Sequence, residues 1–260
     1  MSALLETVRE GRLLHLTLNR PEKRNALNID LCRALVESME TAARDRGVGA
    51  ILLTANGSVF CAGMDLGEIA EGLNSNMLNA LHEQLFTCGA RLEKPMVAAV
   101  EGPALGGGTG LVANCHVVVA SGDATFGLTE IRLGLWPFLV FRAVSAALGE
   151  RRSVELSLTG RIFPAPEARE LGLVHEVSAD AAGRAHEIAV ALSEASPTAI
   201  QSGLSFVQQV RGLPWDKAGE MARMVREDVF GSDDFAEGIR AFLEKRPPKW
   251  PSLGKSDVPH

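Results

Sequence analysis

An apolar segment, Met96 to Val100, leads into three consecutive glycines, Gly106 to Gly108, and a helical pattern follows. Glycine lets the backbone turn tightly and approach a ligand closely, and the first amides of the following helix have no partners within that helix. Such a turn directs N–H groups toward negative charge. Taken alone, the segment is consistent with a plain structural turn and with a site for an anion or oxyanion.

A second segment has the same character. Residues 58–66 follow the strand-like run Ala50 to Thr54 and place small residues next to the carboxylate of Asp65. An enzyme that stabilises a developing oxyanion needs two backbone donors on one oxygen, and two strand-to-loop transitions with free amides can supply them. The two segments together therefore favour an oxyanion site over unrelated turns.

These segments, with others in the same order along the chain, resemble the enoyl-CoA hydratase/isomerase family of the crotonase superfamily. The resemblance implies an α/β fold, a crotonase-like spiral of ββα repeats with a C-terminal helical region. It also implies an acyl-CoA thioester substrate, whose enolate would be held by the backbone N–H groups of Met64 and Gly107. The similarity covers nearly the whole chain and rests on residues 18–27, 60–66, 104–108, 126–134, 158–160 and 168–174.

The same resemblance assigns the residues that would hold coenzyme A. Arg24 and Ala26 are expected beside the pantetheine and the phosphates. Ala62, Asp65 and Leu66 are expected near the adenine and the thioester. Because coenzyme A is part of the substrate, no separate cofactor is expected.

Further contacts are expected around the acyl group and at the C-terminus. Trp136, Phe138 and Phe141 could line the acyl pocket, since such sites are mostly apolar, although core packing explains them equally well. Lys245 could reach a phosphate from an adjoining subunit, or it could be a solvated lysine at the end of a helix.

Glu130 is the candidate for acid–base chemistry. It lies between apolar residues in the segment 128–133, and burial there would raise its pKa from about 4.3 toward the range that suits proton transfer. A glutamate in such a pattern can also be a solvated surface residue, or can pair with Arg132. Its match to a catalytic glutamate of the family favours the catalytic role.

The chain departs from the hydratases of the family at Gly110. Those enzymes carry a second catalytic glutamate there, in a Gly-Gly-Gly-x-Glu pattern, whereas this chain reads GGGTG. Addition of water is usually served by two carboxylates, but a 1,3-proton shift needs only one base. The sequence therefore predicts an enoyl-CoA isomerase with Glu130 as its single base.

Other functions remain open. A hydratase could use Glu130 alone or with Asp65, Glu68 or Glu71 as a substitute, and each substitute could instead be a solvated or capping group. The chain could also be a non-catalytic acyl-CoA-binding homologue, as the missing carboxylate suggests and Glu130 argues against. Dehalogenase, decarboxylase, ring-cleaving and ring-forming members of the resembling family share the same hole, and likeness of fold does not fix the reaction.

Composition and motif searches exclude several classes of function. The net charge of −6 disfavours nucleic acid as a partner, because phosphate binding requires a basic face. No apolar run approaches the roughly 20 residues that span a bilayer, and no secretory leader is evident, so a cytoplasmic location is expected. The six histidines and four cysteines show no metal-ligand spacing, so no metal site is expected, and only His82 is a candidate to face the pocket.

Strands and helices alternate up to Val177, which indicates α/β layers. Four helical segments follow without an intervening strand: 181–195, 197–210, 215–230 and 233–244. We expect residues 1–195 to form the crotonase-like core with the acyl-CoA site, and residues 196–260 to form a helical oligomerisation region. In the resembling family such a region builds a homotrimer, often paired into a hexamer. Packing of these helices on their own core is the alternative.

Overall fold

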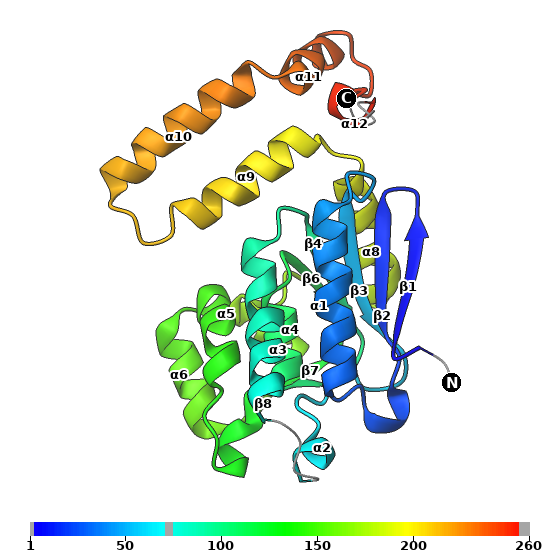
Figure 1. The fold of residues 1–260 in the computed structure, drawn as a ribbon, viewed down its shortest axis with the longest axis vertical. Helices are drawn as coiled ribbons and strands as arrows, with labels where there is room; N and C mark the ends of the chain where they lie inside the picture. The colour runs from blue at the N-terminus through cyan, green and yellow to red at the C-terminus, as the bar shows by residue number, and fades with distance from the viewer. Residues whose placement is uncertain (1–2, 71–74, 255–260) are drawn as a thin grey trace.

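The structure is a computed structural model that describes residues 3–70 and 75–254 (Figure 1). Its main sheet has the order β1-β2-β3-β4-β6-β9, and all neighbours are parallel except the antiparallel pair β1 and β2. A second sheet has the order β5-β7-β8. The strands are β1 (Leu5–Glu10), β2 (Leu13–Leu18), β3 (Ala50–Ala55), β4 (Met96–Val100), β5 (Ala104–Leu105), β6 (Val117–Ala120), β7 (Thr125–Gly127), β8 (Ile162–Pro164) and β9 (Glu176–Val177).

Helices pack on both faces of the main sheet and form the C-terminal part of the chain. The α/β class expected from the sequence is therefore confirmed. The helices are α1 (Ile29–Arg44), α2 (Leu66–Ala70), α3 (Ser75–Cys88), α4 (Gly107–Ala113), α5 (Phe138–Leu148), α6 (Glu150–Thr159), α7 (Ala165–Leu171), α8 (Ala181–Ser193), α9 (Pro197–Gln209), α10 (Trp215–Phe230), α11 (Asp233–Leu243) and α12 (Pro251–Gly254), with 3₁₀ helices η1 (Pro21–Lys23), η2 (Gly89–Arg91) and η3 (Thr129–Leu133).

Helix α1 begins at a side-chain cap. Asn28 precedes it, and its Oδ1 accepts a hydrogen bond from Leu31 N at 3.0 Å, which satisfies one of the free amides of the first turn. Leu31, Leu35 and Met39 recur at helical spacing and are buried on the side that faces the sheet. Residues Ile29–Arg44 therefore form an amphipathic helix with its apolar side buried.

Helix α8 covers the opposite face of the sheet. Ala181, Ala185 and Ala189 recur every four residues, and all are buried against Leu52 and Val97 of the sheet. Small side chains at this spacing let the helix lie close to the strands, since each helical turn presents only a methyl group. Figure 1 shows α1 and α8 on opposite sides of the strands.

Strand β1 is absent from the elements that the sequence predicted. Its side chains are exposed after Leu5, and Val8 is 61% exposed, so no alternation of apolar residues marks it. The strand forms because its backbone pairs with β2 along its whole length. Pairing of this kind depends on the partner strand rather than on the strand's own residues.

Helices α9 to α12 lie at the top of Figure 1, away from the sheet. Within them Asp234 is buried and accepts hydrogen bonds from the hydroxyls of Ser196 at 2.6 Å and Ser252 at 2.7 Å. These bonds join the start of α9, α11 and α12. The helical character predicted beyond residue 181 is confirmed. None of the helices within residues 3–70 and 75–254 has both the length and the apolarity that a membrane crossing requires.

Candidate active site

A cavity of about 920 Å³ lies between α3 on one side and η3 with α5 on the other. The loop before α2 and the glycine turn that opens α4 also border it. The η3–α5 side is mostly apolar, whereas α3 contributes several polar side chains. The lining includes Leu27, Ala62, Gly63, Met64, Leu66, Asn79, His82, Glu83, Phe86, Leu105, Gly106, Gly107, Glu130, Leu133, Trp136, Phe138, Val140 and Ile162.

The backbone amide of Met64 faces away from the segment that pairs with it. Leu27 N donates to Gly63 O at 2.7 Å, and Asp65 N donates to Leu27 O at 3.1 Å. This short parallel pairing uses the groups on either side of Met64, so the Met64 N–H points the other way. Among the described residues it donates to no acceptor.

The backbone amide of Gly107 is free for a different reason. Gly107 is the first residue of α4, and the first amides of a helix have no acceptor within it. Gly106, which precedes it, has a φ of 52°, in the left-handed region that favours glycine. No side chain caps this end of the helix, and in the described chain the Gly107 N–H has no protein partner.

The two loops that carry these amides touch each other. Leu105 N donates to Cys61 O at 2.9 Å, so the loops pair as short strands. A β-carbon at Gly63 would lie 2.8 Å from Leu105 O and 3.2 Å from Gly107 N. Only glycine at position 63 allows this approach. The φ of 89° at Gly63 also favours glycine, because other residues rarely adopt it. Met64 and Gly107, which carry the two free amides, both line the cavity.

Glu130 lies in η3, at the wall of the same cavity. Its Oε2 atom is buried and has no hydrogen-bond partner in the described part of the chain. Burial raises the pKa of this carboxyl and outweighs its own backbone N–H, which lowers it. A β-carbon at Gly106 would lie 3.1 Å from Oε1, so the carboxyl group is next to the glycine turn. Arg132 also borders the cavity but is not a partner of that Oε2.

Thr109 fixes the glycine turn to the strand that precedes η3. Its hydroxyl donates to Ala104 O at 2.6 Å and accepts from Gly127 N at 3.1 Å. Gly106 N donates to Gly127 O at 2.8 Å. Because Gly127 ends β7 shortly before η3, these bonds set the position of Glu130 relative to α4.

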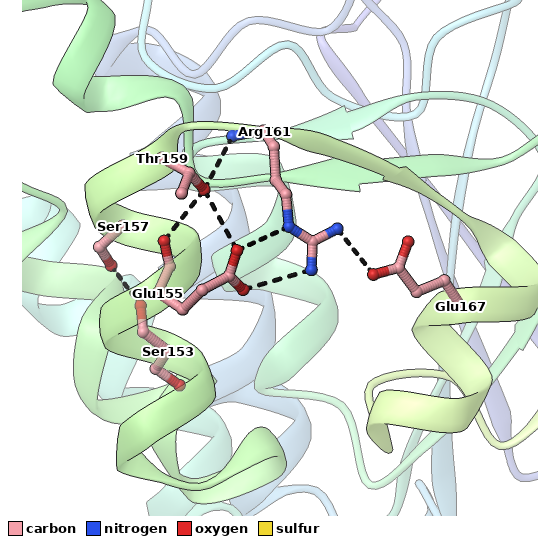
Figure 2. Close-up of polar contacts among 6 residues, drawn as sticks. All are labelled: Ser153, Glu155, Ser157, Thr159, Arg161 and Glu167. Atoms are coloured by element: carbon pink, nitrogen blue, oxygen red, sulfur yellow. Dashed lines mark hydrogen bonds and ion pairs between the residues drawn. The ribbon is translucent and has the colours of Figure 1, made fainter.

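Figure 2 shows Arg161 between Glu155 of α6 and Glu167 of α7. Its Nε donates to Glu155 at 2.7 Å and its Nη1 donates to Glu167 at 2.6 Å. These side chains are one third to one half exposed, so each ion pair adds little to stability. The place of these ion pairs in the fold is more informative than their strength. Gly160, the residue before Arg161, packs against η3, because a β-carbon there would lie 2.7 Å from Cγ2 of Ile131. Arg161, Glu155 and Glu167 therefore join α6 and α7 next to η3.

Position 110 has no room for a side chain. A β-carbon at Gly110 would lie 2.8 Å from Cβ of Val140, closer still to its Cγ1, and 3.1 Å from Cε1 of Phe86. The side chains of α5 and α3 thus occupy the space into which the second glutamate of the family's hydratases would project. Packing and sequence agree that the second carboxylate is missing here.

The acidic residues considered as substitutes have structural partners. Asp65 pairs with Arg20, and burial, which raises its pKa, is outweighed by this guanidinium and by nearby amides, so its pKa lies below its usual range. Glu68 accepts a hydrogen bond from Ile29 N at 3.0 Å, at the start of α1. Neither borders the cavity. Glu71 lies outside the described residues.

The residues expected to bind coenzyme A are placed in two ways. Ala62 and Leu66 border the cavity directly. Trp136, which was expected at the acyl group, borders it on the opposite side. Arg24 and Ala26 lie in the loop before α1 and do not border it, but Ala62 N donates to Arg24 O at 3.0 Å. The loop before α1 is therefore attached to the loop of Met64.

The other predicted residues lie further out. Phe138 borders the cavity and is 71% exposed, whereas Phe141 packs beside Trp136 with ring centroids 6.0 Å apart. Lys245 follows α11, has a φ of 55° and is exposed. It does not border the cavity of its own chain.

Asn25 was not singled out from the sequence, yet it holds these loops together. It is fully buried and has a φ of 51°. Its Nδ2 donates to Asn56 O at 2.9 Å and to Val59 O at 2.8 Å. These bonds join the loop before α1 to the loop after β3. The available sequence signal was the asparagine within the run RNAL, because asparagine adopts the left-handed region more readily than most residues.

His82 lies on α3, is 5% exposed and borders the cavity, as the sequence suggested. Its Nε2 is buried without a partner among the described residues. Burial lowers its pKa to about 4, so the imidazole is neutral near pH 7. Its ring lies 5.6 Å from that of Phe86.

A second group of polar side chains lies away from the cavity. Glu10, His15 and His186 each offer one potential metal ligand, and these atoms lie within 4.8 Å of one another. Nε2 of His186 is 3.0 Å and Nε2 of His15 is 3.2 Å from Oε2 of Glu10. Spacing along the chain does not reveal this group, because its members come from β1, β2 and α8. None of them borders the cavity, and we assign them no part in its chemistry.

Comparisons with known proteins agree with the expected family. A sequence model described as enoyl-CoA hydratase/isomerase matches residues 9–253. Enoyl-CoA hydratase EchA19 of Mycobacterium tuberculosis is 35% identical over 260 residues, which cover 95% of this chain and 96% of that protein. The 2,3-dehydroadipyl-CoA hydratase of Escherichia coli is 36% identical over 251 residues, covering 95% and 98%. The crystal structure of an enoyl-CoA hydratase of Mycobacterium smegmatis superposes with a TM-score of 0.90 at 31% identity, covering 96% of this chain and 99% of that chain.

Proposed function

Because the chain belongs to the enoyl-CoA hydratase/isomerase family and has its crotonase-like fold, we propose that it shifts the double bond of an enoyl-CoA, with Glu130 as the single base. The observation that carries this proposal is Oε2 of Glu130, which is buried beside the glycine turn of α4 and has no partner among the described residues. A carboxyl group with a raised pKa can both accept and return a proton. Coenzyme A is part of the substrate, and the reaction needs no separate cofactor.

The proposed reaction places the thioester oxygen between the amides of Met64 and Gly107. Glu130 removes a proton from C2 of a 3-enoyl thioester, and the electrons of that C–H bond pass to the carbonyl oxygen through a dienolate. Two hydrogen bonds stabilise the resulting negative charge. Glu130 then returns the proton at C4, the electrons leave the oxygen, and a 2-enoyl thioester forms with the carboxylate ionised again.

The remainder of the substrate follows from the lining. The apolar side of the cavity, which includes Trp136 and Phe138, would contact the acyl group. Arg24, Ala26 and Asp65 would lie along the coenzyme A portion, which leaves the cavity past Ala62 and Leu66. Glu83 also borders the cavity, but it is exposed on α3, whereas Oε2 of Glu130 is buried.

Hydration is the second candidate. The relatives from Mycobacterium tuberculosis and Escherichia coli are both named hydratases. Glu130 alone could take a proton from water as its oxygen adds to C3, and then give that proton to C2. The packing at Gly110 counts against this reaction, because it leaves no room for the second carboxylate. Asp65 and Glu68 do not border the cavity, and Glu83, which does, is exposed. A non-catalytic acyl-CoA binder is a weaker candidate, since binding alone does not require a buried, unpartnered carboxyl group.

The C-terminal helices suggest an assembly of several copies. Trp215 is 96% exposed, Phe242 82% and Leu243 73%, and apolar surface of this kind is usually buried against a partner. We propose that it packs in a homotrimer or a dimer of trimers, where Lys245 could approach a neighbouring substrate. Light scattering of the purified chain would give the mass, and a monomer at micromolar concentration would contradict the proposal.

One assay separates the candidate reactions. The purified protein is incubated with a 3-enoyl-CoA and, separately, with a 2-enoyl-CoA, and the products are identified by mass and by retention time. Double-bond migration without a gain of water supports the isomerase. A 3-hydroxyacyl-CoA product would identify a hydratase, and unchanged substrates with measurable binding would identify a non-catalytic binder.

A further inference from the structure

Helix α3 forms one side of the cavity and lines it with several polar side chains, whereas the opposite side is mostly apolar. Asn79, His82 and Glu83 of α3 border the cavity, together with Phe86 one turn further along. Leu133, Trp136, Phe138 and Val140 lie on the opposite side. Asn79 and Glu83 are exposed, whereas His82 is buried. A buried polar group without a partner costs free energy, and a plain alkyl chain would leave His82 without one.

His82 carries most of this polarity. The residue is 95% buried, given its 5% exposed fraction, and Nε2 has no hydrogen-bond partner among the described residues. Leaving such an atom without a hydrogen bond costs free energy. Oε2 of Glu130 is another buried side-chain atom of the cavity without a partner in the described chain, and the proposed reaction explains that one. His82 is not explained by proton transfer at C2 and C4.

His82 and Phe86 line the cavity from the same helix, with their ring centroids 5.6 Å apart. A β-carbon at Gly107 would lie 3.2 Å from Cζ of Phe86, so Phe86 lies against the turn that would hold the thioester oxygen. Because the proposed reaction assigns that oxygen to the amides of Met64 and Gly107, an oxygen that meets His82 is a different one, on another part of the substrate.

We propose that His82 binds a hydroxyl or keto oxygen on the acyl group beyond C3, so that the substrate is an oxygenated acyl-CoA rather than a plain alkyl one. The inference rests on the proposed function, since it assumes that the cavity holds the acyl group. A neutral imidazole has one donor and one acceptor and can satisfy such an oxygen. A carboxylate is a poorer match, because Glu83 is close by on the same helix and the imidazole carries no compensating charge.

Binding of saturated thioesters tests the inference without turnover. Isothermal titration would compare hexanoyl-CoA with hexanoyl-CoA analogues that carry a hydroxyl at C4, C5 or C6. The unaltered protein should bind at least one analogue about threefold to tenfold more tightly than hexanoyl-CoA, as expected for one net hydrogen bond. His82→Leu should abolish or reverse that preference, and His82→Gln should retain part of it.

Controls separate this role from a structural one. His186→Leu removes an imidazole that does not border the cavity and should leave the preference unchanged. If His82→Leu does not fold, as judged by circular dichroism, His82→Phe supplies the apolar replacement. Equal binding of all four thioesters to the unaltered protein, or a preference that survives in the Leu variant, would overturn the inference. Failure of every thioester to bind would count against the proposed function itself.

Discussion

Glu130 rests against Gly106: a β-carbon at Gly106 would lie 3.1 Å from Oε1 of the glutamate and 3.4 Å from its carboxyl carbon. Gly106 also has a φ of 52°, which an L-residue rarely adopts. The same glycine therefore shapes the turn before α4 and leaves space for the carboxyl group.

Gly106→Ala should consequently impair both stability and turnover. The added methyl group meets the carboxyl group and forces a left-handed alanine, which costs of order 1–2 kcal/mol. We expect a lower Tm and a kcat reduced at least tenfold, with binding of acyl-CoA less affected. Gly122→Ala is a suitable control, since a β-carbon there meets nothing within 4 Å. Full activity of the Gly106 variant would show that the carboxyl group does not depend on this contact.

Glu130→Gln should reduce turnover by about 10²-fold or more while leaving acyl-CoA binding roughly intact, because the amide keeps the shape but cannot accept the proton. In the unaltered enzyme the rate should rise with pH through the raised pKa of Glu130, above its ordinary 4.5. The variant should lack this acidic limb. A pH–rate profile of both proteins makes the measurement, and identical profiles would remove Glu130 from the mechanism.

The same substitution has a predicted sign for stability. A pKa that is higher in the folded protein than in the unfolded chain means that the folded state holds the proton more tightly. Stability from this group is present at low pH and is lost as pH rises through the folded pKa. Glu130→Gln should therefore be at least as stable as the unaltered protein at pH 7. A marked drop in its Tm would indicate a structural role instead.

Gly107→Pro tests the second proposed donor of the oxyanion site. Proline is tolerated at the first position of a helix, and it removes the N–H that would meet the substrate. The rate should fall about 10²–10³-fold, as is usual when one such donor is lost. Gly107→Ala is the matched control, because it adds a β-carbon against Leu27 and Phe86 but keeps the amide. Equal rates in the two folded variants would exclude this amide from catalysis.

Much of the site could be predicted because its determinants are local. The turn at Gly106 and Gly107 follows from steric freedom at consecutive residues, and the start of α1 follows from the Asn28 cap. Glu130 was found through the short segment around it. The approximate bounds of α1 and β4 are likewise local, since each depends on the periodicity of its own apolar residues.

The rest depends on residues distant in sequence. β1 exists only through its pairing with β2, and Asn25 acquires its role only when the loop of Val59 folds beside it. The missing side chain at Gly110 was evident, but that Val140 fills the space was not. No local pattern encodes contacts of this kind.

Gly110→Glu tests whether that filled space excludes a second carboxylate. Alone it should destabilise the protein by about 1–3 kcal/mol, because it overpacks the region against Val140 and Phe86. Combined with Val140→Ala, which removes the nearest methyl groups, the loss of stability should be partly recovered. The two changes should therefore be non-additive in a double-mutant cycle of Tm or unfolding free energy.

The double variant also has a functional expectation. With a carboxylate opposite Glu130, hydration of a 2-enoyl-CoA should increase relative to double-bond migration. The ratio of 3-hydroxyacyl to isomerised product measures this change. An unaltered ratio in a folded double variant would show that the second carboxylate does not decide between the two reactions.

Glu237 provides a test of the C-terminal helices that is independent of catalysis. It is 5% exposed, accepts hydrogen bonds from Arg246 at 2.6 and 3.1 Å and from Lys249 N at 2.8 Å, and these partners lower its pKa to about 2. Because the pKa of Glu237 is lower in the folded protein than in the unfolded chain, where it is about 4.3, the ionised carboxylate stabilises the folded state above that value. This stability is lost as pH falls toward 2.

Glu237→Gln should thus lower Tm at pH 7, and the difference from the unaltered protein should shrink between pH 4.5 and 2. Glu220→Gln, which breaks only the exposed pair with Lys217, should show almost no difference at either pH. A Glu237 effect that stays constant down to pH 2 would mean that packing, rather than the charge, holds the end of α11 in place.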